Sequence, residues 1–372
     1  MKIRSLATSF LLCATVGGCT DSDPPAIPRI DEAPVVDLPA RTTNISGVVF
    51  DPEGYFFTFM MLPEEEAEGA LPGVFNGPYV GIPAIVGGQV TLAAPGGGDL
   101  VASPASFLGS WQVLGAPASD TTTYIASATP PAEGVFFDPT APVQLPEGTY
   151  YPTTFVRPIL TNVTQCYGQS ALLVGNAGAL DAVAQHLTAG GTPTTVEDLL
   201  DPAKTGGVAL LWVHQPSFLA DLFLLPADSV AGETTAGQLI ALDWAPPEGL
   251  PGQSPMGFMA LPDPLSMVGY FALVFPPNAT EPVTVSFTDT FELPPGEEPD
   301  PEAPPRPFLI PPLTVEPRAG VVTVQRTFGQ FAPPEPGEGP PDEGGGLEDP
   351  GPPEPEPTWA CYAPPMDGPP EE

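Results

Sequence analysis

Proline and glycine limit what this chain can fold into more than any other feature of its sequence. The chain has 57 Pro and 40 Gly among 372 residues, so about a quarter of its positions resist a regular helix. Its apolar fraction, 42%, is nonetheless ordinary for a globular protein. The breaker residues must therefore be concentrated between folded segments.

Short apolar segments separated by turn residues predict a mainly β fold built from antiparallel, immunoglobulin-like sandwiches. Between 42 and 165 the expected strands are Ile45–Phe50, Tyr55–Leu62, Tyr79–Ile85, Gln89–Ala93, Thr122–Ala126, Gly134–Phe137 and Thr149–Leu160. Between 206 and 330 they are Val208–Val213, Leu219–Leu225, Gln238–Asp243, Gly257–Ala260, Met267–Phe275 and Val283–Thr288, with 308–328 as a late strand segment. We expect one sandwich at 42–165 and a second at 206–330, and the alternative is a single large β-domain.

A short helical connector is expected between the two sandwiches, at 166–205. From residue 169 onward the apolar residues approximate one face of a helix. A second short helix is predicted to begin at Thr194, with Glu197 completing a capping box, and to stop at Asp201. Both helices would cover an edge or an end of a sandwich.

Stretches rich in Pro, Glu and Gly flank or interrupt these segments and are expected to be extended and disordered. They are a tether at 19–41, a linker at 292–307 and a tail at 331–372. Residues 332–372 alone contain 14 Pro, 11 acidic residues and no basic residue. Such a composition favours extended, self-repelling chain.

The N-terminus has the pattern of an export leader. Lys2 and Arg4 precede a short apolar stretch that ends in small residues. The tetrapeptide Val16-Gly17-Gly18-Cys19 resembles the lipobox of bacterial lipoproteins. The resemblance implies that residues 1–18 are removed and that Cys19 carries the lipid, with the alternative that cleavage occurs elsewhere and Cys19 is a free thiol. We expect a lipid-anchored protein of the bacterial cell envelope, on the periplasmic or surface face of the outer membrane.

The charge balance excludes several classes of partner. Removal of Lys2 and Arg4 with the leader would leave 7 basic residues against 45 acidic ones. Such a field repels nucleic acid and anionic lipid head groups, so nucleic acid is not expected as a partner. No calcium-loop pattern accompanies the acids, and no metal or other cofactor is predicted.

The four cysteines divide by their expected fate. Cys13 would leave with the leader and Cys19 would take lipid, so Cys166 and Cys361 remain as a pair in an oxidising compartment. Cys361 lies in the apolar sequence TWACYAPPM, within an otherwise acidic tail. We therefore expect a Cys166–Cys361 disulfide, with two unrelated thiols as the alternative.

Two motifs carry a resemblance to a known family. The sequence ISGVVFDPEG, with Ile45, Gly47, Asp51 and Gly54, is similar to the opening strand of carboxypeptidase regulatory-like domains. These domains are small immunoglobulin-like sandwiches of secreted and surface proteins. The DPEG sequence that ends the motif also has the residues of a type I turn.

The closing motif of that family is matched near the end of the same segment. The sequence LPEGTYYPTTFV resembles the family's last strand, where Gly148 permits a turn and Tyr150 enters the core. The stretch between the motifs is longer than the family's, and YFFTFMML replaces its second-strand pattern. The resemblance implies an architecture and no chemistry of its own.

Few residues suggest catalysis. His186 and His214 are 28 positions apart without a cysteine pair beside them, so each is interpreted as structural or exposed rather than as a metal ligand. The GQSAL and GQSPM sequences lack the second glycine of a serine-hydrolase motif. The aromatic run around Tyr55 and Phe56 could form a platform for sugars, but a buried core is the favoured interpretation.

Two hypotheses for the function are consistent with these sequence features. The first is a non-catalytic envelope lipoprotein that acts as a scaffold or binding module for a protein or a polysaccharide. The second is an envelope hydrolase of glycosides or peptides that uses carboxylates within 169–245. The anchor and the two family-like motifs favour the first.

Overall fold

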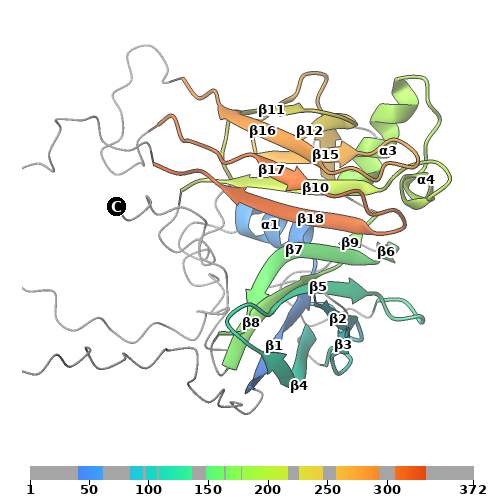
Figure 1. Cartoon of the computed structure of the whole chain (residues 1–372). Helices are drawn as coiled ribbons and strands as arrows, with labels where there is room; N and C mark the ends of the chain where they lie inside the picture. Colours follow the sequence, from blue (N-terminus) through green and yellow to red (C-terminus); the bar gives the residue numbers. More distant parts are fainter. Residues whose placement is uncertain are drawn as a thin grey trace, which may run out of the picture. The chain divides into compact units, whose positions relative to one another are not determined.

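The computed structural model describes residues 41–61, 84–94, 98–106, 109–135, 148–162, 165–176, 178–216, 226–245, 257–292 and 306–331. All of them belong to one compact unit. Within these ranges the fold is mainly β, as predicted, with three helices on one side of a large sheet (Figure 1).

A nine-stranded sheet runs through the whole unit. Its order is β13 (Gly257–Ala260), β12 (Gln238–Ala245), β15 (Tyr270–Val274), β10 (Val208–His214), β18 (Val322–Phe328), β7 (Thr153–Leu160), β5 (Thr123–Thr129), β2 (Gln89–Ala93) and β3 (Leu100–Val101). β18 pairs in parallel with β10 on one side and with β7 on the other. The last strand of the described chain thus hydrogen-bonds the two predicted sandwich segments into one sheet.

Three smaller sheets complete the β structure. The first contains β4 (Ser110–Ala118), β1 (Arg41–Phe50) and β8 (Gln165–Leu172), in that order. The second contains β14 (Leu265–Ser266), β11 (Val230–Thr234), β16 (Val283–Asp289) and β17 (Leu313–Val315). The third pairs β6 (Tyr150–Tyr151) with β9 (Val174–Gly175).

Layers of apolar side chains join these sheets. One core lies between β1, β4 and β8 and the β2–β5–β7 part of the large sheet. A second core lies between β11, β16 and β17 and the β10–β15 part. A third core fills the opposite face of that part, under the helices. All seven residues of β10 are buried, because this strand is covered on both faces.

The helix α1 (Pro52–Met61) replaces a predicted strand. The prediction of a strand at Tyr55–Leu62 is wrong, and DPEG forms the first turn of this helix rather than a hairpin turn. Asp51 Oδ1 accepts hydrogen bonds from the amides of Glu53 (2.9 Å) and Gly54 (3.1 Å). An aspartate cap followed by Pro and Glu is a strong helix start, and it outweighs the β propensity of the aromatic run.

The connector is helical only in its later part. α3 (Ala179–Ala189) and α4 (Val196–Leu200) form as expected, but the helical prediction for residues 169–175 is wrong because β8 and β9 occupy them. β8 pairs in parallel with β1, so tertiary pairing decides its structure. The capping box lies one residue later than predicted, with Thr195 and Asp198 as its members.

Most of the other predicted strands are present. The strands expected at Gln89–Ala93 and Gly257–Ala260 are confirmed with the same bounds. The sequence patterns missed β4 and β11, whose residues lack a clear apolar alternation. The strand predicted at Leu219–Leu225 lies outside the described residues, as do residues 79–83 and 136–137 of two other predicted strands. Of the remainder of those two, Ala84 forms only an isolated bridge with Phe50, and residues 134–135 are in no strand. The division into two domains stays a prediction.

Gly47 should be essential for the pairing of β1 with β8. A Cβ atom on Gly47 would lie 1.8 Å from the backbone carbonyl oxygen of Gln169, so β8 would have to move. We expect Gly47→Ala to lower the free energy of unfolding by about 3 kcal/mol or more, measured by urea denaturation. Gly88→Ala is the control, because its Cβ would make ordinary contacts at 3.4 Å or more. Equal midpoints for the two variants would contradict the close approach.

Candidate functional site

The residues of the two family-like motifs come together in the structure. Ile45 is fully buried in the core beneath β1, and Gly47 lies against β8. Gly148 is exposed just before β6. The hydroxyl of Tyr150 on β6 donates to Asp51 Oδ2 at 2.8 Å. The opening and closing motifs, 99 positions apart at this contact, are therefore joined by a buried hydrogen bond.

Glu53 is the residue that sequence reasoning missed at this place. It lies two positions after Asp51 and is 4% exposed. Its Oε1 accepts a hydrogen bond from the Tyr270 hydroxyl at 2.6 Å. Both of its carboxylate oxygens also lie within 3.2 Å of the Ala179 amide at the start of α3. A Cβ on Gly178 would lie 1.5 Å from Oε2, so the approach requires glycine there.

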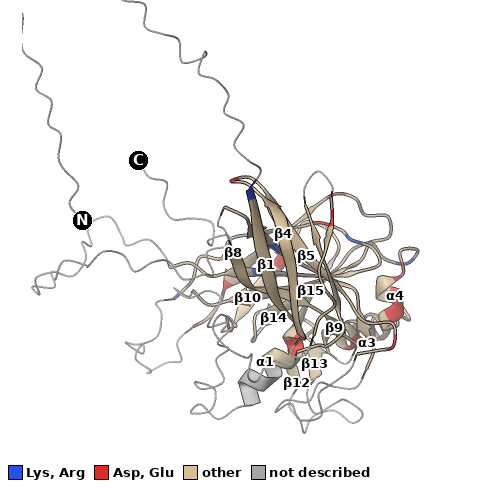
Figure 2. Cartoon of the chain, turned by 90° about the horizontal axis from the view of Figure 1, so that it is seen from below, with Lys and Arg blue, Asp and Glu red and all other residues tan. Residues whose placement is uncertain are grey.

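Asp51, Glu53, Tyr150 and Tyr270 form what we call the carboxylate node. It joins the end of β1 and the start of α1 to β6, α3 and β15. Figure 2 shows this acidic segment in red at the start of α1. The node is buried beside the aromatic core, where Tyr270 stacks on Trp212 with ring centroids 3.7 Å apart.

Burial controls the ionisation of the node. Desolvation, together with the nearby charge of Asp51, raises the pKa of Glu53 from 4.5 to about 8, although hydrogen bonds from Tyr270 and Ala179 oppose the shift. Desolvation also raises the pKa of Asp51. The pKa values of Tyr150 and Tyr270 are raised above their ordinary range, first by burial, so both phenols stay protonated and donate.

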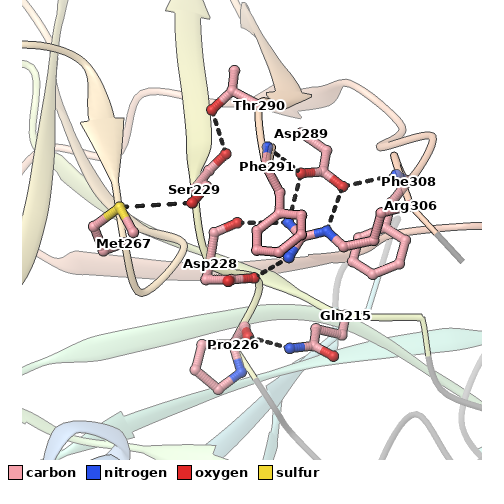
Figure 3. Close-up of polar contacts among 10 residues, drawn as sticks. All are labelled: Gln215, Pro226, Asp228, Ser229, Met267, Asp289, Thr290, Phe291, Arg306 and Phe308. Atoms are coloured by element: carbon pink, nitrogen blue, oxygen red, sulfur yellow. Dashed lines mark hydrogen bonds and ion pairs between the residues drawn. The ribbon is translucent and has the colours of Figure 1, made fainter. Parts of the chain in front are cut away.

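A second charged cluster, the Arg306 clamp, holds the chain where it leaves β16 (Figure 3). Arg306 Nε donates to Asp289 Oδ2 at 3.0 Å and Nη2 to Asp289 Oδ1 at 2.5 Å. Arg306 also pairs with Asp228, through that residue's carboxylate and its carbonyl oxygen. The guanidinium lies between the rings of Phe291 and Phe308, 4.0 and 4.8 Å from their centroids.

The clamp compensates the charge of a buried acid. The Asp289 side chain has no exposed surface. Burial alone would raise its pKa, but the hydrogen bonds from Arg306 and from the amides of Phe308 and Phe291 outweigh burial and hold the pKa below its usual value. Fork-like pairing of this kind is specific to arginine.

Neither histidine has the surroundings of a metal ligand set. His214 ends β10, as predicted, and is 4% exposed between the rings of Trp212 and Phe328. His186 lies half-buried on α3. Across the described ranges, no three His, Cys, Asp or Glu side chains are grouped so that they could hold a metal ion.

Of the cysteines predicted to carry lipid or to form a disulfide, the structure describes Cys166. Cys166 is fully buried on β8, with Sγ 3.2 Å from the Leu160 carbonyl oxygen. Cys19 and Cys361 lie outside the described residues, so lipidation and the disulfide stay predictions. No helix among the described elements is both long and apolar enough to span a bilayer.

Of the aromatic run, Phe56 is buried and packs against Trp212 and Phe258, with centroids 5.3 and 5.6 Å away. The core interpretation is therefore confirmed for this residue. Tyr55 is half-buried. The side chains of residues 57–61 are outside the description.

A groove of about 560 Å³ lies between α3 and the start of α4, and its lining is more apolar than polar. Its lining includes Asn176, Asp181, Gln185, Thr188 and Glu197. Burial raises the pKa of Asp181. Glu197 has a pKa below its usual value because its own amide and the hydroxyls of Thr195 and Tyr151 hydrogen-bond to it. We call this feature the α3–α4 groove.

Comparison of the chain with protein-family models, with curated proteins and with solved structures finds no match in any of the three. The resemblance to carboxypeptidase regulatory-like domains thus stays a prediction that depends on the motif residues alone.

Protonation of Glu53 should make the fold more stable in mild acid. Its pKa is higher in the folded than in the unfolded chain, so its contribution is complete below about pH 4.5 and is lost as the pH rises through about 8. The free energy of unfolding should fall over this window by up to about 1.4 kcal/mol per pH unit from this one proton. Urea denaturation at several pH values measures it.

Glu53→Gln should flatten that dependence, because the amide keeps an acceptor but has no proton to lose. Glu233→Gln is the matched control, since it removes one negative charge from an exposed position on β11. A pH slope that is the same in the wild type and in Glu53→Gln would contradict the assignment.

Loss of Arg306 should destabilise the fold, because the buried Asp289 would then lack its charge partner. Arg306→Gln is expected to lower the free energy of unfolding by about 3–5 kcal/mol, because one partner of a buried ion pair remains uncompensated. Arg306→Lys should recover only part of this, since lysine cannot form the paired hydrogen bonds. Thermal and urea unfolding measure the stability of both variants. Wild-type stability of Arg306→Lys would argue against a role for the paired hydrogen bonds from the guanidinium to Asp289.

Proposed function

We propose that this protein is a non-catalytic lipoprotein of the bacterial cell envelope, anchored through Cys19, that acts as a scaffold or binding module for a protein or a polysaccharide. The observation that supports it best is the use of the buried acids. Asp51, Glu53 and Asp289 are bonded to side chains and amides of the fold itself. Acidic side chains whose hydrogen-bond partners all belong to the fold stabilise that fold rather than act on a substrate.

The ligand surface that we propose is the α3–α4 groove. Its amide, hydroxyl and carboxylate groups come from Asn176, from α3, and from the start of α4 with the threonines before it. Groups of this kind can hydrogen-bond to the hydroxyls of a sugar or to the backbone of a peptide. The strongly acidic chain disfavours anionic ligands.

A second candidate, hydrolysis, is favoured by one specific feature of the same groove. Asp181 and Glu197 both line it, and their environments move their pKa values in opposite directions. Acid and base pairs in glycosidases show such a difference, and they also need a set separation between their two carboxylates. Glu197, however, is hydrogen-bonded to Tyr151 at 3.1 Å, which agrees equally with a structural role.

One experiment separates the two functions. The chain from residue 20 onward is incubated with a glycan array and with a panel of chromogenic glycoside and peptide substrates. We expect binding without turnover, and weaker binding by at least about tenfold for Asp181→Asn. Reproducible turnover that is lost in Asp181→Asn or Glu197→Gln would overturn the non-catalytic assignment. The exposed-site variant Glu233→Gln serves as the control.

The anchor is tested separately on the full-length chain expressed in a bacterium. Detergent phase partitioning and intact mass should show a lipid-modified chain that begins at Cys19, and Cys19→Ala should abolish the added mass. A wild-type chain without lipid that fractionates with the cytosol would contradict the proposed location.

A further inference from the structure

A second groove adjoins the α3–α4 groove. It has a volume of about 630 Å³ and lies between α3, the residues after α4, the start of β12 and the end of β15. Thr194 lines both grooves, so they meet at the loop that joins α3 to α4. We call the second one the β15 groove. Its lining is more apolar than polar, and its apolar residues are Leu187, Pro193, Val274, Phe275, Pro276 and Pro277.

Hydrogen bonds fix the backbone on both sides of the β15 groove. On the loop side, Thr188 Oγ1 accepts from the Thr194 amide at 3.0 Å and donates to the Thr194 carbonyl oxygen at 3.1 Å. On the β15 side, the Phe275 amide donates to the Gly207 carbonyl oxygen at 3.1 Å, and the Gly206 amide donates to the Phe275 carbonyl oxygen at 3.0 Å. The walls are therefore formed before a ligand arrives, and binding requires little further ordering of the protein.

The two grooves differ in charge. The α3–α4 groove is lined by Asp181 and Glu197, and the described residues that line it include no basic one. Hydrogen bonds from its own amide and from the Thr195 hydroxyl hold the pKa of Glu197 below its usual value, so this acid is ionised at neutral pH. In the β15 groove, Asp198 forms an ion pair with Lys204. A ligand that fits both grooves should therefore carry a cationic group beside a neutral, apolar one.

The lining favours a peptide over a polysaccharide as this ligand. Sugar rings pack well on the exposed face of an aromatic ring, but Phe275, the one aromatic residue among the described lining residues, is only 1% exposed. An extended peptide places side chains of different chemistry at intervals of about 3.3–3.6 Å. One segment can thus present a basic side chain to the acids and apolar side chains to the β15 groove. An arginine side chain also forms paired hydrogen bonds with a carboxylate.

We propose that the two grooves together bind an extended peptide segment of a partner protein, with a basic residue in the α3–α4 groove and apolar residues in the β15 groove. This inference rests on the proposed function and names the ligand class of that binding module. The chain as a whole has 45 acidic and 9 basic residues. Its field attracts a cationic segment and speeds the association.

The test uses the chain from residue 20 onward and fluorescein-labelled peptides of about 12 residues. Each peptide consists of Gly and Ser with one Arg and, at a spacing that is varied across the set, a Leu-Leu pair. Fluorescence anisotropy measures Kd. At one or more spacings we expect binding about tenfold tighter or more than for the same peptide with Gln in place of Arg, or with Ser-Ser in place of Leu-Leu. A set in which neither substitution weakens binding would overturn the proposal.

Variants in each groove test the placement of the peptide. Asp181→Asn should weaken binding of the Arg peptide about tenfold or more and change binding of the Gln peptide by less than about twofold. The exposed prolines Pro193 and Pro277, both replaced by Ser, should weaken binding of the Leu-Leu peptide about fivefold or more and leave that of the Ser-Ser peptide unchanged. Glu233→Gln is the control for a lost surface charge. An unchanged urea midpoint shows that each variant is folded, and equal losses for both peptides of a pair would overturn the placement.

Two outcomes separate this inference from the proposed function. Binding of glycans but of none of the peptides would overturn the peptide inference and leave the binding-module function intact. Mass spectrometry of the peptides after incubation should show intact chains. Cleavage of a bound peptide would support the ligand class and overturn the non-catalytic function.

Discussion

The buried carboxylate of Glu53 is the interaction on which the described fold depends most. It binds the hydroxyl of Tyr270 in the large sheet and the first amide of α3, so one side chain fixes the sheet and a helix relative to the start of α1. Burial of this acid is costly, and although hydrogen bonds from Tyr270 and Ala179 offset part of the cost, desolvation still raises the pKa of Glu53 to about 8. The two donors lie on β15 and α3, which are distant in sequence from Glu53. Both elements must therefore be folded and in place before the Glu53 side chain can be buried with its hydrogen bonds.

The large sheet explains why the third core is rich in aromatic side chains. α1 and α3 lie over the face of the sheet that carries Trp212, Tyr270 and Phe258. Large flat rings fill the space between a sheet and helices, and Trp212 and Tyr270 stack there. The proposed ligand surface lies on α3 and α4, the helices that cover this aromatic core.

The sequence predicted the class of the fold and many of its strands, because alternation of side chains and turn residues are local signals. It failed at Tyr55–Leu62, where the aromatic run favours a strand but the Asp51 cap on the amides of Glu53 and Gly54 starts a helix, and Phe56 on that helix packs against Trp212. It also failed at β8, whose pairing with β1 joins segments more than 100 positions apart.

The site was predictable only in part. Asp51 and Tyr150 were singled out through the motifs, and the structure joins them. Glu53 was hidden because its partner Tyr270 is 217 positions away, and no local pattern marks that contact. Asp51-Pro52-Glu53 nevertheless offered one signal, since an aspartate followed by Pro and Glu is a helix start and the segment that follows it is apolar.

The Arg306 clamp has a consequence for how this chain can evolve. It fastens Asp289 and Phe291 to Arg306 and Phe308, the residues on either side of the stretch 293–305. Closing a flexible loop between fixed ends costs only about 0.6 kcal/mol for each doubling of its length. Changes in the length of this stretch should therefore cost little stability, and they should leave the register of β16 and β17 unaltered.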